Sequence, residues 1–135
     1  MTFAELRTDI VIVTCAVSAG IHGALVPEHA GEGTGAGLGF VAATVLLAVL
    51  AVALTLRPAS ELAFAGAAVV FVGLLVSYAA AVTTGVPVLH PERETVDGLA
   101  LFTKAIEVVG LLTAVTALRL PFVPIRHMQP KGTLT

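Results

Sequence analysis

The sequence predicts an all-α fold, a transmembrane up-down bundle of four helices, on three observations. Hydrophobic residues make up 57% of the 135 residues and charged residues only 12%, whereas a soluble domain has about 25% charged residues. The mean hydropathy is +1.00. Four apolar runs are each long enough to cross a hydrocarbon layer of ~30 Å. Short connections between such runs make sequential helices antiparallel, so we expect a single membrane domain over residues 1–135.

Each apolar run is expected to be a helix, because backbone polar groups in lipid must be paired within their own segment. The runs are rich in Ala, Val and Leu and lack the strict alternation of a membrane β-strand. The first run (10–27) contains His22 but no formal charge, the second (36–56) and third (62–88) contain no charge, and the fourth (98–118) contains Lys104 and Glu107. The expected helices cover about residues 9–27, 36–56, 61–86 and 96–119.

The connections carry the residues that interrupt helices. The glycine-rich segment EHAGEGTG (28–35) is expected to be a flexible loop. In the turn RPASE (57–61), Pro58 blocks continuation of the second helix and Ser60 is a candidate cap for the third. Two prolines lie between the third and fourth helices, and residues 120–135 are expected to form a polar tail.

The distribution of Lys and Arg predicts the orientation in the membrane, because cytoplasmic loops carry an excess of both. One side of the expected bundle holds five of these residues, and the other side holds only Arg93. We therefore expect a multi-pass protein of the plasma (inner) membrane with both termini cytoplasmic. The five residues on the cytoplasmic side are Arg7, Arg57, Arg119, Arg126 and Lys131.

Lys104 and Glu107 need an explanation, because a charge at the membrane centre costs about 2.5–3.5 kcal/mol. They are three residues apart and lie on one helix face, where they can pair. Asp97 lies seven residues before Lys104, at the outer end of the same face. From the helix rise, Glu107 lies roughly 15 Å below Asp97 and close to the midplane. It is expected either to be paired or to be protonated.

Other polar side chains are expected at a similar depth. Ser18 and His22 follow each other at a helical interval on the first helix, and Ser77 and Tyr78 reach the same level on the third. The expected polar network therefore consists of Ser18, Tyr78, Asp97, Lys104 and Glu107, together with His22. Two interpretations stay open. The network is either a structural pairing that sets helix register, or a proton or ion pathway through His22, Lys104 and Glu107, since histidine titrates near neutral pH.

Histidine and glutamate also recur at the outer ends of the first and third helices, in Pro27-Glu28-His29 and His90-Pro91-Glu92. Imidazole and carboxylate ligands together suit Zn, Cu(II), Ni or Fe. The leading hypothesis is therefore an outward-facing site that binds or senses a divalent metal or a small ligand. The alternative is that His29 and His90 are ordinary solvated loop residues. The candidate ligands are His22, Glu28, His29, His90 and Glu92.

The sequence offers little for other functional classes. A net charge of −2 gives no basic surface for nucleic acid, and there is no nucleophile elbow or phosphate loop, so an enzyme is not favoured. The single cysteine cannot form an internal disulfide. A third interpretation is a non-catalytic accessory subunit of a larger membrane complex. The expected partners are the lipid bilayer and a second copy or another subunit.

Three segments carry a resemblance: HGALVPEH (22–29), LHPE (89–92) and KAIE (104–107). With them the chain resembles a group of small, uncharacterised four-helix integral membrane proteins of high-GC Gram-positive bacteria, over about residues 9–119. The resemblance implies the four-helix topology and carries no activity.

Overall fold

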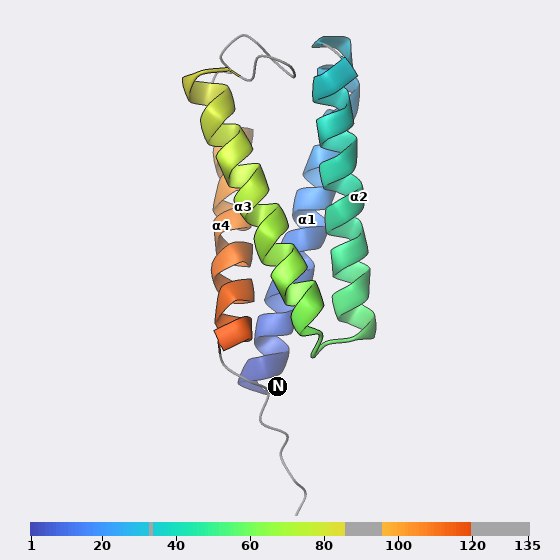
Figure 1. The fold of residues 1–135 in the computed structure, drawn as a ribbon, viewed down its shortest axis with the longest axis vertical. Helices are drawn as coiled ribbons and strands as arrows, with labels where there is room; N and C mark the ends of the chain where they lie inside the picture. Colours follow the sequence, from blue (N-terminus) through green and yellow to red (C-terminus); the bar gives the residue numbers. More distant parts are fainter. Residues whose placement is uncertain (33, 86–95, 120–135) are drawn as a thin grey trace, which may run out of the picture.

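The structure, a computed structural model, describes residues 1–32, 34–85 and 96–119. It confirms the all-α four-helix bundle (Figure 1). All four helices are long and apolar enough to cross a membrane, which is compatible with a multi-pass membrane protein. The helices are α1 (Phe3–Glu32), α2 (Thr34–Leu56), α3 (Glu61–Thr83) and α4 (Gly98–Arg119).

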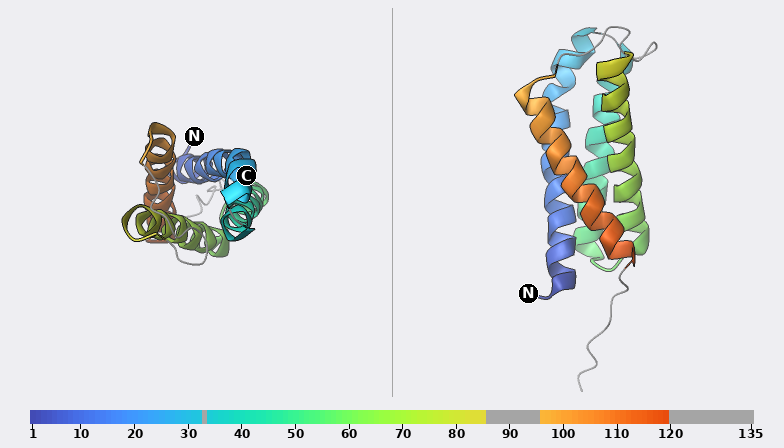
Figure 2. Two further views of the ribbon diagram at one scale, coloured as in Figure 1. Left: turned by 90° about the horizontal axis from the view of Figure 1, so that it is seen from above. Right: turned by 90° about the vertical axis from the view of Figure 1, so that its left-hand side faces the viewer.

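Sequential helices run in opposite directions and are arranged as a square when viewed along the bundle (Figure 2). α1 packs along α2 and along α4, and it also touches α3. α2 and α4 lie diagonally opposite each other in that view. A polar side chain on α1 can therefore lie against α2 or α4, the two helices with which α1 packs along its length.

α1 begins earlier than the expected boundary at residue 9, because a capping box starts it. The Thr2 backbone N–H donates to Glu5 Oε2 at 2.6 Å, and the Glu5 N–H donates to Thr2 Oγ1 at 3.2 Å. This reciprocal pair satisfies two N–H groups that a helix start leaves without partners. The polar segment before the apolar run is therefore helical as well.

The expectation of a flexible loop over residues 28–35 is wrong, because α1 and α2 continue through nearly all of it. Pro27 lies inside α1. A proline ring in a helix meets the carbonyl four residues earlier, which here belongs to Gly23. The two helices also approach closely at this end, since a Cβ on Gly37 would lie 2.9 Å from Ala30 Cα. α1 and α2 therefore pack closely against each other where this glycine-rich segment is helical.

The boundaries of α3 follow from its caps. Ser60 Oγ accepts from the Ala63 backbone N–H at 3.2 Å, which confirms the expected N-cap. At the other end the helix stops at Thr83, before the expected boundary at 86. The Thr84 N–H still donates to Ala80 O, and Gly85 follows with φ 71°. Glycine takes this left-handed conformation readily, and so it ends helices.

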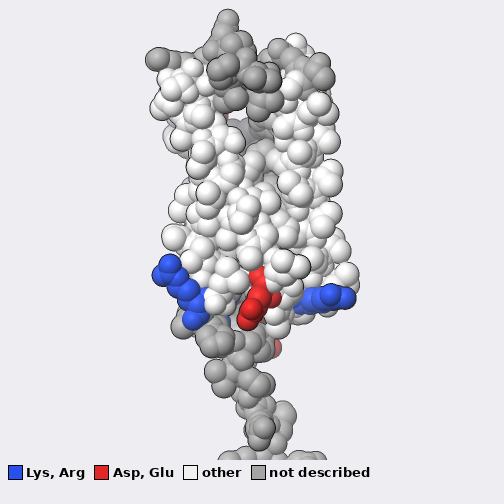
Figure 3. Space-filling view, viewed as in Figure 1, with Lys and Arg blue, Asp and Glu red and all other residues white. Residues whose placement is uncertain are grey.

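The two ends of the bundle differ in composition. The N-terminal part of α1, the α2–α3 turn and the end of α4 meet at the arginine end, which holds Arg7, Arg57 and Arg119. Arg7 Nη1 donates to Thr116 O at 3.1 Å, and the Thr8 hydroxyl donates to Pro58 O at 3.3 Å. In the face of Figure 3 the charged side chains lie at this lower end, and the rest of the visible described surface is uncharged. The opposite end, with His22 and His29, is called the histidine end.

The apolar core fills the middle of the bundle and the half nearer the arginine end. Its largest fully buried apolar side chains are Val11, Cys15, Leu47, Leu54 and Phe71. Many other large apolar side chains point outward, as expected for helices that face lipid. The buried ionisable side chains His22 and Glu107 lie beyond this core, toward the histidine end.

Candidate functional site

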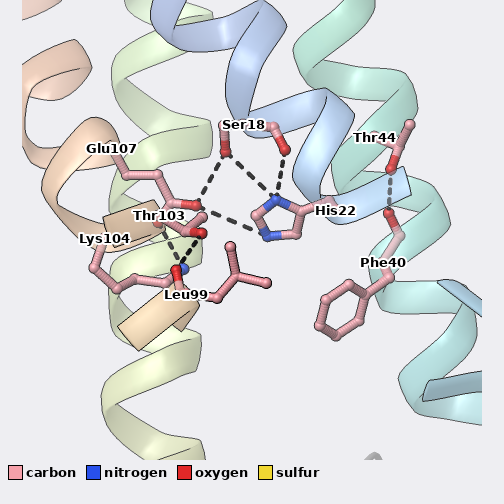
Figure 4. Close-up of polar contacts among 8 residues, drawn as sticks. All are labelled: Ser18, His22, Phe40, Thr44, Leu99, Thr103, Lys104 and Glu107. Carbon is pink, nitrogen blue, oxygen red and sulfur yellow. Dashed lines mark hydrogen bonds and ion pairs between the residues drawn. The ribbon is translucent and has the colours of Figure 1, made fainter. Parts of the chain in front are cut away.

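Glu107 is the centre of a buried polar cluster formed with Ser18, His22 and Lys104 (Figure 4). Its side chain is 0% exposed. The Ser18 hydroxyl donates to Glu107 Oε1 at 3.1 Å, and Lys104 Nζ donates to Oε2 at 2.7 Å. His22 Nε2 lies 3.8 Å from Oε1. Each carboxylate oxygen therefore faces a donor, which offsets part of the cost of burying the carboxylate.

The contacts of His22 identify which of its two ring nitrogens can gain or lose a proton. Nδ1 lies 2.9 Å from the Ser18 carbonyl oxygen, which can only accept, so Nδ1 carries a hydrogen. The same nitrogen is 3.4 Å from Ser18 Oγ, whose own hydrogen goes to Glu107. Nε2 is then the nitrogen that gains or loses a proton, and it faces the Glu107 carboxylate. The geometry makes Nε2 the acid–base position of the cluster.

Lys104 turns inward, toward the bundle. Its side chain is 16% exposed, and its Nζ lies 5.2 Å from the centroid of the Tyr78 ring on α3. An ammonium over an aromatic face is attracted by the ring. Asp97 is not part of this cluster: its Oδ1 accepts from the Ala100 backbone N–H at 2.7 Å and caps α4. Of the expected polar network, Asp97 therefore has a structural role.

A tight contact separates the cluster from the arginine end. Gly110 is one turn beyond Glu107 on α4, and a Cβ there would lie 2.6 Å from Phe71 Cε2 and Cζ and 2.7 Å from Thr14 Oγ1. The Thr14 hydroxyl donates to Val11 O and so is occupied within its own helix. Among the described residues, the polar side chains buried nearer the arginine end are Thr14 and Thr8 only.

An aromatic contact lies on the other side of the cluster. The Phe40 ring of α2 stacks on His29 with centroids 3.8 Å apart, and its centroid is 5.4 Å from that of His22. His29 Nδ1 also lies 3.1 Å from the Leu25 carbonyl oxygen. α2 can reach this position because Gly23 has no side chain, and a Cβ there would lie 3.3 Å from Thr44 Cγ2. A phenyl ring thus lies against both imidazoles.

The five expected metal ligands do not form a site among the residues that the structure describes. Within that part of the chain no group of three His, Cys, Asp or Glu side chains could hold a metal ion. Glu28 is exposed, and His22 faces Glu107 and Lys104. His90 and Glu92 lie outside the described residues, as do the tail 120–135 and the charged residues Arg93, Arg126 and Lys131.

Sequence reasoning included two residues that do not belong to the cluster, Ser77 and Asp97, and missed two phenylalanines that lie on either side of it. Ser77 is exposed and does not join the cluster, because its neighbour Tyr78 takes the inward position. Phe40 and Phe71 were not singled out, since a phenylalanine in an apolar run resembles any other. The glycines opposite them, Gly23 and Gly110, were the available signal, but small residues are frequent throughout this chain.

Searches against protein-family models, curated proteins and solved structures find no match to this chain.

Proposed function

We propose that this protein is a membrane protein that binds and releases a proton at His22, from the histidine end of the bundle. The observation that supports the proposal is the fully buried Glu107 carboxylate, whose Oε1 accepts from the Ser18 hydroxyl and lies 3.8 Å from His22 Nε2. A proton arriving at Nε2 creates an imidazolium directly beside a negative charge, which offsets part of the cost of burying the imidazolium.

The proton does not need to rearrange the cluster. Nδ1–H stays on the Ser18 carbonyl oxygen, while Nε2 changes from a bare nitrogen to a donor that faces Glu107. Lys104 keeps the carboxylate neutralised in the state without the extra proton. Side chains at membrane depth that titrate in this way are characteristic of proton relays. The described residues thus supply an acceptor, a counter-charge and a fixed tautomer.

Access is expected from one side only. The Phe71–Gly110–Thr14 contact and the apolar core lie between the cluster and the arginine end. Toward the histidine end, the face in Figure 3 is hollowed near the top of the bundle. With the orientation that the Lys and Arg distribution predicts, this end faces outward. The proposal is therefore a proton site loaded from outside, which favours sensing or coupling over uncoupled conduction across the membrane.

The test is nuclear magnetic resonance of the ¹⁵N-histidine-labelled full chain in vesicles. The signals of His22 are assigned by their loss in His22→Gln. We expect the Nδ1–H tautomer at high pH and a doubly protonated ring after acidification. In Glu107→Gln the same acidification should protonate far less of His22, because the neighbouring carboxylate is gone.

The matched control is His127→Gln, which removes a histidine of the polar tail and should leave the His22 signals unchanged. A His22 ring that keeps a single proton between pH 4 and pH 8 would overturn the proposal. Equal protonation of His22 in the wild type and in Glu107→Gln would also overturn it.

A further inference from the structure

The Tyr78 hydroxyl is a buried polar group that the proton site does not use. Its oxygen is inaccessible to solvent and has no hydrogen-bond partner among the described residues. A buried hydroxyl without a partner costs about 1–3 kcal/mol. The ring that carries it lies against the Lys104 ammonium, with Nζ 5.2 Å from the ring centroid. The Lys104 ammonium therefore lies against the ring that carries this unpaired hydroxyl, and both groups can donate hydrogen bonds.

Both groups have donor capacity left. An ammonium has three N–H bonds, and the Lys104 side-chain bond that the structure gives is the one to Glu107 Oε2. The Tyr78 O–H has none within the described part of the chain. A ligand that fits this pair must therefore supply acceptor atoms. A metal cation does not fit, because Lys104 repels it.

The charges of the cluster indicate the charge of the ligand. With Lys104 positive, Glu107 negative and His22 neutral, the net charge is zero, and a proton on His22 makes it +1. A net charge within the membrane is expensive, and one monovalent anion beside Lys104 returns the sum to zero. A dianion would leave an excess negative charge instead. Proton binding and anion binding are therefore expected to favour each other.

The groups that face His22 allow this coupling. Glu107 and Lys104 face it from α4, and His29 lies on its own helix. α3 contributes Tyr78, next to Lys104. α2 carries no ionisable side chain and contributes Phe40. Lys104 is the cation that anion binding would neutralise, since its ammonium also contacts Tyr78.

We infer that the Tyr78 hydroxyl and the Lys104 ammonium bind a small monovalent anion, a halide or a small carboxylate, together with the proton on His22. The anion site depends on the proposed proton function only for its coupling to pH. A small anion fits better than a lipid phosphodiester, because the Lys104 side chain is only 16% exposed. Taken together, the site binds the equivalent of a weak acid, one proton and one anion.

The experiment uses the full chain in an uncharged detergent without lipid, with gluconate as the bulky background anion. Thermal unfolding is followed by circular dichroism while formate or chloride replaces gluconate at constant ionic strength. We expect saturable stabilisation, tighter at pH 5.5 than at pH 7.5. Tyr78→Phe keeps the ring over Lys104 and removes only the hydroxyl. It should weaken formate binding about tenfold or more, the size of one hydrogen bond to a charged group.

The matched control is Ser77→Ala, which alters the exposed neighbour of Tyr78 and should bind formate like the wild type. Lys104→Met combined with Glu107→Gln keeps the cluster neutral and should abolish binding. Formate that binds Tyr78→Phe as tightly as the wild type would overturn the site, and so would identical stability in formate and in gluconate. Stabilisation by added anionic phospholipid but not by formate would overturn it as well, in favour of a lipid headgroup.

The two proposals fail separately. If formate binds equally well at both pH values while the His22 signals show proton uptake, the coupling between anion binding and proton binding is refuted. The proton function is then unaffected. The opposite result is also informative. If Tyr78→Phe weakens formate binding at both pH values and His22 is never protonated, the anion site is upheld and the proton function is overturned.

Discussion

Replacing Lys104 by methionine should leave an uncompensated negative charge in the bundle. Methionine keeps an unbranched side chain of similar length, so the main loss is the 2.7 Å bond from Nζ to Glu107 Oε2. Removing one partner of a buried ion pair costs about 3–5 kcal/mol. Glu107 is fully buried, but Ser18 still donates to its other oxygen. We therefore expect a loss near the lower end of that range, about 3 kcal/mol.

The measurement is reversible unfolding by dodecyl sulfate in mixed dodecyl maltoside micelles, followed by the helical circular dichroism signal. The double variant Lys104→Met/Glu107→Gln should recover to within about 1 kcal/mol of the wild type, because it replaces the pair and leaves no charge. Arg57→Met, at an exposed position, is the matched control and should change stability by less than about 0.5 kcal/mol.

The pH dependence of Lys104→Met gives a second check. The folded variant relieves its buried charge by holding a proton on Glu107, which the unfolded chain has released. Its stability therefore falls as the pH rises, so the loss relative to wild type should be larger at pH 8 than at pH 5. Two results would refute this reasoning: a loss below about 1 kcal/mol at pH 8, or a double variant as unstable as the single one.

Two further substitutions test the packing and the helix boundaries by the same unfolding assay. Gly110→Ala should cost about 1–3 kcal/mol by overpacking against Phe71. Its control is Gly73→Ala, whose Cβ meets nothing within 4 Å and which should not destabilise the protein. Equal effects of the two substitutions would contradict the tight contact at Gly110. Ser60→Ala should cost about 1 kcal/mol through loss of the α3 N-cap, and Ser60→Asp should retain most of the stability because aspartate also caps helices. An alanine variant as stable as the wild type would show that the cap contributes nothing.

The four-helix fold could be predicted because it depends on long-range composition. Apolar runs of sufficient length are easy to recognise, and in lipid they have no alternative to helix. The boundary at Ser60 was also predictable, since its capping chemistry is local. The segment 28–35 was misread because glycine content favours a loop in an isolated chain. Packing of Ala30 against Gly37 involves two helices, and local sequence does not reveal it.

The candidate site was predicted in its membership more than in its geometry. The spacing of Lys104 and Glu107 indicated a pair, and the structure shows that pair. The depth of His22 along its helix suggested that it lies near them, and its 3.8 Å distance to Glu107 agrees. Asp97 was assigned to the same face but caps α4 instead, because an aspartate just before a helix is drawn to unpaired backbone N–H groups. Helical spacing does not distinguish these two roles.

The sequence by itself determined that this chain forms four apolar helices and that a few ionisable side chains lie among them, because the cost of placing charge and unpaired backbone in hydrocarbon follows from residue types alone. Only the tertiary structure decided which side chains meet: Ser18 and His22 on Glu107, Tyr78 on Lys104, and a phenylalanine on either side of the cluster. The reason is physical. Depth follows from counting residues along one helix, whereas contact depends on how each helix is rotated against its neighbours, and that rotation is set by close packing across the whole bundle.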